Sequence, residues 1–264
     1  MDISGLIDDF QLKLKHGHSS YDLLRVAAHF RRLELEQALY SHLKGMIVDG
    51  PFMGMKLLPN AHSSTLCPKL LGTYEAEVQA DIIRLSNGVD SFLNIGCAEG
   101  YYTTALSLMA GIKRVSGVDI NPNSLNAARA MAEINNTSNK CLFISDIQSA
   151  LQALTGKLLT MIDVDGSELK VIDDLLSCIS NGFSEALHIL IETDFLPTGE
   201  SNKLAIIKRF LANGFRLSKE ISQNPTKRMS PYATTLTKSF LDLSIYGLEG
   251  RPINQSWLIF ELLA

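Results

Sequence analysis

The chain has 264 residues and a formal net charge of −4, with 46% hydrophobic and 20% charged residues. This composition can supply a buried core, which excludes disorder as the main state. No basic excess is present, which argues against a protein that binds by neutralising phosphates. The longest stretch without Asp, Glu, Lys or Arg covers the 13 residues 100–112, too short to cross a bilayer.

The start of the chain and its cysteines indicate a reducing compartment. The chain begins Met1-Asp2-Ile3 rather than with basic residues and an apolar run, so we expect no signal peptide. The four cysteines are far apart and form no CxxC pair, which favours reduced thiols over a disulfide framework or a zinc site. We therefore expect a cytoplasmic protein that does not bind membranes.

Two helices are predicted within residues 1–45, where apolar residues recur at helical spacing and the segment 17–20 interrupts the pattern. Residues 46–73 are rich in glycine and proline and are expected to form a loop, with a hairpin as an option. We treat 1–73 as an N-terminal helical and loop extension and 74–264 as the main domain.

From Phe92 onward, short apolar runs alternate with amphipathic helices. Helices are predicted to begin near residues 74, 100, 122, 167 and 201. The predicted strands cover residues 92–95, 115–118, 141–144, 158–162, 187–191, 215–221 and 257–262. This alternation predicts an α/β fold with a Rossmann-like, doubly wound, mainly parallel sheet of seven strands.

The segment 222–255 does not follow the alternation. It is a connection of about 34 residues that contains three prolines and two glycines, with one short helix expected near 236–243. Connections of this length are usually functional, so we interpret the segment as a lid-like insertion. The alternative is a surface excursion without a role in the site.

A glycine-rich turn follows the first predicted strand directly. It reads Gly96-Cys97-Ala98-Glu99-Gly100, and its small residues let the backbone approach a ligand at the start of a helix. Asp119 lies 23 residues after Gly96, at the end of the second strand. A carboxylate there can accept hydrogen bonds from both hydroxyls of a ribose. The two features together predict a cofactor that contains a nucleoside.

The spacing of the turn favours one cofactor over another. A dinucleotide site requires G-x-G-x-x-G, whereas this chain has Ala98 at the middle glycine and Tyr101 at the third. The observed G-x-A-x-G spacing resembles the motif of class I S-adenosylmethionine-dependent methyltransferases. Their usual form has an acidic residue two positions before the first glycine, where this chain has Asn94.

The resemblance extends to the FkbM-type branch of that superfamily. The most specific segment is 162–168, Ile-Asp-Val-Asp-Gly-Ser-Glu, whose usual form has Glu in place of Asp165. The other similar segments are 50–56, 68–75, 94–102, 251–252 and 255–258. Residues 1–45 lie outside the resemblance.

The resemblance implies a role for individual residues. It places the methionine part of S-adenosylmethionine on the turn, the ribose on Asp119 and the adenine against Ile120 and Asp146. Capping of the following helix is an alternative role for Asp146. From their positions in the chain, Tyr74 is expected to close over the cofactor and Tyr101 to face its sulfonium. The alternatives are a helix start for Tyr74 and packing of helix against sheet for Tyr101. The expected cofactor-binding residues are Tyr74, Asn94, Gly96, Cys97, Ala98, Gly100, Tyr101, Asp119, Ile120 and Asp146.

Acidic residues follow the fourth and fifth predicted strands, which are neighbours of the first in the usual methyltransferase order. Ligands of parallel α/β sheets bind at these carboxyl ends. We expect Asp163, Asp165 and Glu192 to be catalytic, with Glu168 and Asp194 nearby. A carboxylate there can act as a base for a hydroxyl acceptor. A divalent metal held by the same oxygens is left open, as is a purely structural role in helix capping.

The sequence thus predicts an S-adenosylmethionine-dependent methyltransferase that O-methylates a small molecule or a saccharide, because FkbM-type relatives act on hydroxyls. We expect no nucleic-acid partner, and a homodimer is left open. One alternative is an NAD(P)-dependent oxidoreductase, although no Tyr-x-x-x-Lys pair follows the fourth strand. The other is a non-catalytic module that binds a partner through its N-terminal helices.

Overall fold

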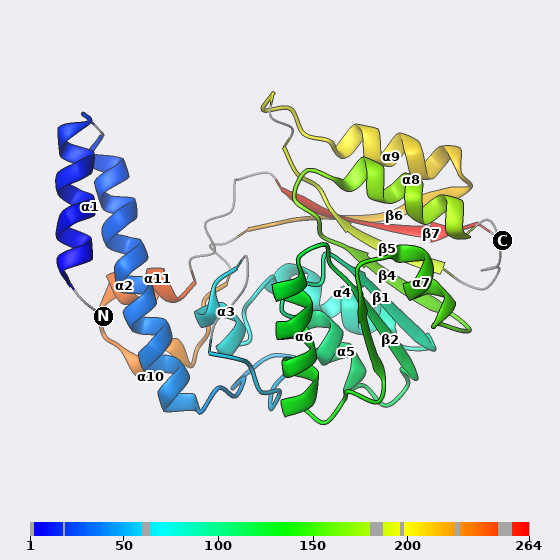
Figure 1. Cartoon of the computed structure of the whole chain (residues 1–264), viewed down its shortest axis with the longest axis horizontal. Helices are drawn as coiled ribbons and strands as arrows, with labels where there is room; N and C mark the ends of the chain where they lie inside the picture. Colours follow the sequence, from blue (N-terminus) through cyan, green and yellow to red (C-terminus); the bar gives the residue numbers. More distant parts are fainter. Residues whose placement is uncertain are drawn as a thin grey trace.

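The computed structural model describes residues 3–17, 19–59, 64–179, 187–195, 198–224, 228–247 and 255–263. Its centre is a seven-stranded sheet in the order β3-β2-β1-β4-β5-β7-β6 (Figure 1). The strands β3, β2, β1, β4 and β5 pair in parallel, and β7 runs antiparallel to both β5 and β6. The strands are β1 Ser91–Ile95, β2 Arg114–Val118, β3 Cys141–Ile144, β4 Leu158–Ile162, β5 Leu187–Glu192, β6 Phe215–Ser222 and β7 Ser256–Leu262.

Helices cover both faces of the sheet because neighbouring residues of each buried strand point to opposite sides. Phe92 packs into the core of one face and Leu93 into the core of the other. The first core includes side chains of α4 Ala76–Ser86, α5 Tyr101–Ser107 and α6 Pro122–Ile134. The second includes those of α7 Ile147–Gln152, α8 Glu168–Ile179 and α9 Lys203–Ala212. The doubly wound, mainly parallel fold predicted from the sequence is confirmed.

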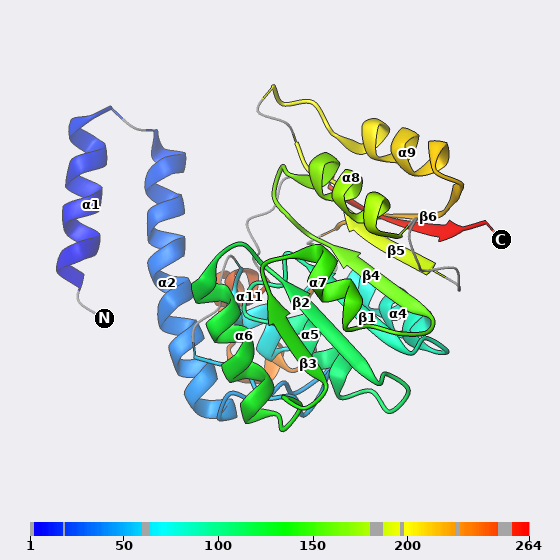
Figure 2. The same ribbon diagram turned by 45° about the vertical axis from the view of Figure 1, so that its right-hand side comes forward.

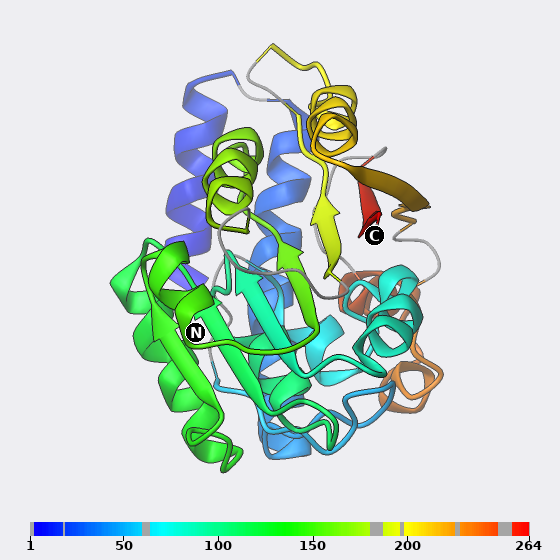
Figure 3. The ribbon, with the colours of Figure 1, turned by 90° about the vertical axis from the view of Figure 1, so that its right-hand side faces the viewer.

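The N-terminal helices pack beside the sheet rather than within it (Figures 2 and 3). They are α1 Ile3–Lys15 and α2 Ser20–Leu43, and a capping box between Ser19 and Asp22 fixes the start of α2. Leu35 and Leu39 of α2 enter the same core as Ile245, from the segment between β6 and β7. Residues far apart in sequence thus form one layer next to the α4–α5 face.

That segment contains two short helices, α10 Ala233–Leu236 and α11 Phe240–Tyr246, where the sequence predicted one. Arg31 of α2 holds α11 through Asp242, with Nε–Oδ1 and Nη2–Oδ2 distances both of 2.9 Å. Residues 46–59 form a single antiparallel bridge, Met46 with Lys56, instead of a hairpin. A further five-residue helix, α3 Leu66–Leu70, was not predicted.

Among the described residues, no helix is long and apolar enough to span a membrane. Residues 225–227 and 248–254 of the lid-like insertion, including the similar segment at 251–252, lie outside the described residues.

Candidate active site

The glycine turn has the close packing that its small residues predict. Gly96 has φ +83°, and a Cβ there would lie 1.7 Å from the carbonyl oxygen of Asp163. Gly100 has φ +82°, and a Cβ there would lie 2.9 Å from that of Ala128 on α6. Ala98 also has a positive φ of 45°, which is uncommon for a residue with a Cβ. The turn therefore joins β1 to α5 while touching β4 and α6.

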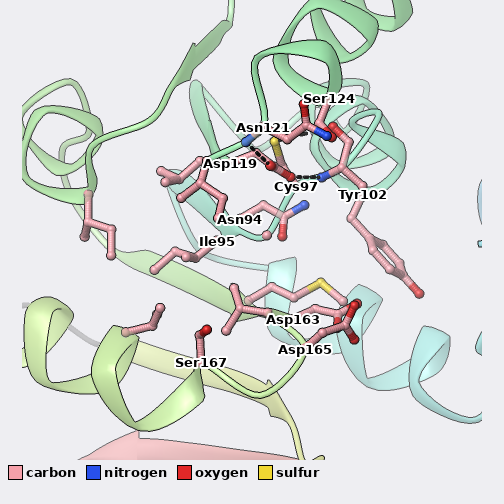
Figure 4. Close-up of a pocket in the computed structure, with 18 of the residues that line it drawn as sticks. Asn94, Ile95, Cys97, Tyr102, Asp119, Asn121, Ser124, Asp163, Asp165 and Ser167 are labelled. Atoms are coloured by element: carbon pink, nitrogen blue, oxygen red, sulfur yellow. Dashed lines mark hydrogen bonds between the residues drawn. The ribbon is translucent and has the colours of Figure 1, made fainter. Parts of the chain in front are cut away.

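A cavity of about 1070 Å³ opens at the carboxyl ends of these strands (Figure 4). It is lined by residues from the ends of β1, β2, β3, β4 and β5, by α3 and the loops before and after it, by one side of α8 along its length, and by Gln255 before β7. All ten expected cofactor-binding residues except Gly100 line it, as do Asp163 and Asp165. Gly100 instead packs on α6. The requirement for glycine there comes from this close packing and from the backbone conformation of the turn.

Asp119 stabilises the turn from the end of β2 (Figure 4). Its Oδ2 accepts a hydrogen bond from the backbone N–H of Ala98 at 2.9 Å, and its Oδ1 accepts one from Asn121 at 2.8 Å. A carboxylate oxygen can accept more than one hydrogen bond, so both oxygens retain capacity for a ligand. Ile120 lines the cavity with 93% of its surface exposed. An apolar side chain so exposed is suited to the face of a flat ring.

Asp146 lies at the β3 end of the cavity and caps α7. Its Oδ2 accepts the backbone N–H of Ser149 at 2.7 Å, and this hydrogen bonding lowers the pKa of the carboxyl. The capping role considered from the sequence is therefore present. The cavity also reaches Ser145, Ile147 and Gln148, so a ligand lying there would pass directly over Asp146.

At the other end of the cavity, Lys69 of α3 pairs with Glu99 of the glycine turn. The two side chains are only 4% and 2% exposed, and both residues line the cavity. The Lys69 Nζ also donates to the Ser64 Oγ at 2.6 Å and lies 4.7 Å and 5.1 Å from the ring centroids of Tyr74 and Tyr101. Burying a charge pair carries a large desolvation cost, and this pair lies at the cavity wall.

The sequence analysis did not identify Lys69 or Glu99 as site residues. The family pattern places an acid at position 94, but Asn94 is buried and donates from Nδ2 to the Thr103 Oγ1 at 3.2 Å. The acidic group on this wall is Glu99, one residue beyond Ala98. A signal was present: Glu99 is the only charged residue of the turn, within a segment of otherwise small or buried side chains.

The two tyrosines after the turn form part of an aromatic cluster. Tyr101 meets Tyr74 edge-on at 5.4 Å between ring centroids, and both residues line the cavity. Tyr102 donates from its hydroxyl to the Glu75 Oε2 at 2.5 Å. Burial and the neighbouring Glu75 carboxylate raise the pKa of Tyr102 well above its usual value. Glu75 itself is fully buried and has φ +49° at the start of α4.

Cys97 lines the cavity as a buried, neutral thiol. It is 3% exposed, and burial, aided by the Asp119 carboxylate, raises the pKa of its thiol. A thiol of this kind is not a reactive nucleophile. Its contribution to the site is therefore shape: the Sγ lies close to Gly117 of β2, where a Cβ would come within 3.0 Å of it.

The acidic residues at the strand ends separate into two groups. Asp163 is half-buried and Asp165 exposed, and both line the cavity, as does Asp194 after β5. Burial raises the pKa of Glu168, and the carboxylates of Asp194 and Asp163 raise it further. Carboxylates that influence each other in this way share one region of the strand edge.

Glu192 does not line this cavity. It is 4% exposed and accepts a hydrogen bond from the Gln223 Nε2. The Gln223 Oε1 in turn accepts from Arg228, which forms an ion pair with Glu77. The cause is strand alternation: Leu190 belongs to the core under α4 and α5, and Glu192 points to the same face. Glu192 thus belongs to a buried polar chain behind the site.

The described structure offers no set of ligands for the divalent metal that was left open. Within the described residues, no group of three or more His, Cys, Asp or Glu side chains is arranged to hold a metal ion.

The family of the chain follows from its sequence together with this fold and cavity. A family model described as "Methyltransferase domain" matches residues 87–220, about half of the chain. The chain belongs to this family. The enzyme class expected from the glycine turn, a class I S-adenosylmethionine-dependent methyltransferase, is confirmed at this level.

Three solved structures that are similar to this chain are the following. Precorrin 8W decarboxylase of Methanobacterium thermoautotrophicum has 17% identity and a TM-score of 0.47, covering 71% of this chain and 90% of that one. Magnesium protoporphyrin IX methyltransferase of Synechocystis PCC 6803, with bound SAM, has 16% identity and a TM-score of 0.47, covering 72% and 80%. The complex of aTrm5 with tRNALeu has 14% identity and a TM-score of 0.45, covering 71% and 46%.

This chain thus spans less than half the length of aTrm5. No curated protein matches it in sequence. We infer no substrate from these likenesses.

Proposed function

We propose that the cavity binds S-adenosylmethionine and that the protein is an FkbM-type O-methyltransferase of a small molecule or saccharide. The observation that carries the proposal is the pair of chemically different ends of the cavity. One end offers the Asp119 carboxylate beside the exposed Ile120, and the other offers the buried pair Lys69–Glu99. When bound, the cofactor supplies a methyl group carried on a sulfonium.

The residues at the first end fit an adenosine. Asp119 is held by two backbone N–H groups and keeps lone pairs for ribose hydroxyls. Ile120 offers an apolar surface for the base, and Asp146 lies at the far limit of this end. These features support the roles of Asp119, Ile120 and Asp146 that the family resemblance implies.

The residues at the second end fit the zwitterion of methionine. Lys69 complements a carboxylate and Glu99 complements an ammonium, so one buried ion pair matches two opposite charges of the ligand. The Oγ1 of Thr65 is buried at the same wall and has no hydrogen-bond partner among the described residues. A ligand carboxylate would provide that partner.

Between the two ends, Asp163 follows β4 and faces the cavity. We propose that it accepts the proton of the acceptor hydroxyl while the hydroxyl oxygen takes up the methyl group, whose bond to sulfur breaks to leave a neutral thioether. Asp165 lies close by. Burial and the carboxylates of Asp194 and Asp163 raise the pKa of Glu168, because like charges oppose ionisation, so Asp163 lies within reach of the other acidic groups of this edge. Glu192 is better explained as a support for this edge through Gln223.

The domain organisation enters the proposal in the same way. We propose that 74–264 forms the catalytic domain and that 222–255 forms a lid-like insertion. Of the described residues of the insertion, Gln255 alone lines the cavity, while α11 packs against α2 and α10 packs against α11. Any closure would therefore act through the ends of the insertion rather than through its helices.

Calorimetry with two ligands tests the proposal. S-adenosylhomocysteine carries the amino acid part, whereas 5′-methylthioadenosine lacks it. We expect Lys69→Met to weaken S-adenosylhomocysteine by roughly 10- to 100-fold, the value of a hydrogen bond to a charged group. The affinity for 5′-methylthioadenosine should change by less than about twofold, because its contacts lie at the Asp119 end.

Lys170→Met is the matched control, since Lys170 also lines the cavity but is exposed and pairs with Asp174. It should leave both affinities unchanged. Lys69→Met alone leaves the Glu99 carboxylate buried without its ion-pair partner. The double variant Lys69→Met with Glu99→Gln removes both charges and so controls for this effect. Equal weakening of both ligands by Lys69→Met would contradict the assignment of the methionine end. Failure of the wild type to bind S-adenosylhomocysteine would contradict the proposed cofactor.

A further inference from the structure

Gln255 has an unsatisfied oxygen at the cavity wall. The side chain is 6% exposed and lines the cavity, and its Oε1 has no hydrogen-bond partner among the described residues. Leaving a buried carbonyl oxygen without a partner costs free energy, so such groups are rare in folded proteins. A ligand that donates a hydrogen bond at this position would satisfy it.

The orientation of this amide is fixed by its neighbours. The Gln255 Nε2 donates to the Asp194 Oδ1 at 3.2 Å, and the same oxygen accepts the backbone N–H of Phe195 at 2.7 Å. A carboxylate oxygen of an ionised Asp can only accept, so the amide must turn its nitrogen toward Asp194. The carbonyl oxygen is therefore the atom left for another partner.

Asp194 is itself held in place by a chain of hydrogen bonds. Its backbone N–H donates to the Asn202 Oδ1 at 2.9 Å, and the Asn202 Nδ2 donates to the Glu168 Oε2 at 2.7 Å. The Glu168 Oε1 accepts the backbone N–H of Gly166 at 2.9 Å. The chain joins the loop before α8, the end of β5 and the start of β7, and it holds Gln255 in one orientation.

The position of Gln255 separates it from the cofactor end. In the sheet order β1-β4-β5-β7, Asp163 follows β4, Asp194 follows β5 and Gln255 precedes β7. Because β7 is antiparallel to β5 and Glu192 pairs with Trp257, Gln255 lies at the same edge as the strand ends. The residues proposed for the cofactor come from β1, β2, β3 and α3. The β4–β5–β7 side is left for the acceptor.

We infer that the Gln255 Oε1 accepts a hydrogen bond from a hydroxyl of the acceptor that lies next to the one that is methylated. Gln255 thereby selects a neutral polyhydroxylated molecule such as a small saccharide. The inference rests on the proposed function, which already names the class of acceptor, and adds the residue that recognises the hydroxyl beside the reacting one. Vicinal hydroxyls can donate to the Gln255 Oε1 and to the Asp163 and Asp194 carboxylates. A phosphate-rich acceptor would meet these carboxylates as like charges. Asp194, Asn202 and Glu168 act as positioning residues for Gln255.

A screen followed by a substitution tests this. The purified chain is incubated with S-adenosylmethionine and each of a panel of methyl hexopyranosides, and with a short single-stranded RNA, and a 14 Da gain is sought by mass spectrometry. The sugar that is methylated is then compared with its monodeoxy analogues. In the wild type, we expect loss of one neighbouring hydroxyl to lower kcat/KM by roughly 10- to 100-fold, because a buried group is left unpaired.

Gln255→Met keeps the length of the side chain and removes both polar groups. In this variant, the parent sugar and that deoxy analogue should react at similar kcat/KM, while the affinity for S-adenosylhomocysteine stays within about twofold of the wild type. The exposed Gln152 on α7 provides the control Gln152→Met, which should keep the full discrimination. The unchanged affinity for S-adenosylhomocysteine shows that the variant is folded.

Three outcomes would overturn the inference. The first is that Gln255→Met discriminates between the parent sugar and its deoxy analogue as strongly as the wild type does. The second is that the RNA gains mass and no sugar does. The third is that no sugar gains mass although the protein binds S-adenosylhomocysteine. Failure of the wild type to bind S-adenosylhomocysteine would count against the proposed function instead, so the two failures are distinguishable.

Discussion

The backbone of Gly96 passes so close to Asp163 that a Cβ on Gly96 would lie 1.7 Å from the Asp163 carbonyl oxygen. The Asp163 backbone N–H also donates to the Ile95 carbonyl oxygen at 2.9 Å. The turn proposed to hold the cofactor and the residue proposed as the base are therefore parts of one rigid unit between β1 and β4. Changes that displace the backbone of one are expected to reach the other, whereas a change confined to the Asp163 carboxylate is not.

Gly96→Ala should damage this unit severely. A Cβ would clash with backbone atoms, which cannot move without separating β1 from β4, and φ +83° adds strain of about 1 kcal/mol. We expect a fall of several degrees in Tm and loss of S-adenosylhomocysteine binding, measured by thermal unfolding and calorimetry. Gly166→Ala is the matched control because Gly166 has φ +82° with nothing within 4 Å of a Cβ. If both variants lose the same stability and affinity, the effect comes from the positive φ that the two glycines share and not from the contact of Gly96 with Asp163.

Asp163→Asn should affect chemistry more than cofactor affinity. The variant keeps the shape of the side chain and removes its ability to take up a proton. We expect kcat with the screened acceptor to fall by roughly 10²- to 10⁴-fold, as for loss of a general base. The affinity for S-adenosylhomocysteine, measured by calorimetry, should change little, because its proposed contacts lie on other elements. Parallel losses of kcat and of cofactor affinity would make Asp163 a cofactor-binding or structural residue.

The ion pair between α2 and α11 should give a pH-dependent contribution to stability. Hydrogen bonds from Arg31 lower the pKa of Asp242, so the unfolded chain binds this proton more readily than the folded one. The stabilisation is present above the unfolded pKa of about 3.9 and is lost as the pH falls through the lower folded value. Because Arg31 is 44% exposed, we expect Asp242→Asn to cost only about 0.5–1 kcal/mol at pH 7.

Urea unfolding of the wild type and Asp242→Asn at several pH values measures this contribution. The difference in the free energy of unfolding should shrink as the pH drops below about 3.9. A difference that is constant from pH 7 to the acid limit would show that the variant acts through packing rather than through charge.

The strands of this fold are readable from sequence because each is a short apolar run between turn residues. All seven observed strands lie within one residue, at either end, of the predicted ranges. The start of α6 is equally clear, since Asn121 caps it with a hydrogen bond to the backbone N–H of Asn123 and Pro122 follows. By contrast, α3 has only five residues and no helical period, so local pattern could not reveal it.

The site residues that could be predicted are those that directly follow a recognisable strand. Gly96, Ala98 and Asp119 are of this kind, because the strand-to-helix transition places them. Lys69 and Glu99 are 30 residues apart, and their pairing depends on how α3 packs over the turn. Gln255 gains its place from the antiparallel β7, which brings a residue near the end of the sequence to the end of β5. Such contacts arise from tertiary packing and leave no local pattern.

Whether the cavity at Asp119 binds S-adenosylmethionine is measured by calorimetry of S-adenosylhomocysteine and NAD with the wild type and Asp119→Ala. We expect the wild type to bind one S-adenosylhomocysteine per chain and no NAD. We expect Asp119→Ala to weaken S-adenosylhomocysteine by roughly 10- to 100-fold, through loss of charge-assisted hydrogen bonds to the ribose. If the wild type binds NAD tightly and does not bind S-adenosylhomocysteine, the proposed cofactor is wrong.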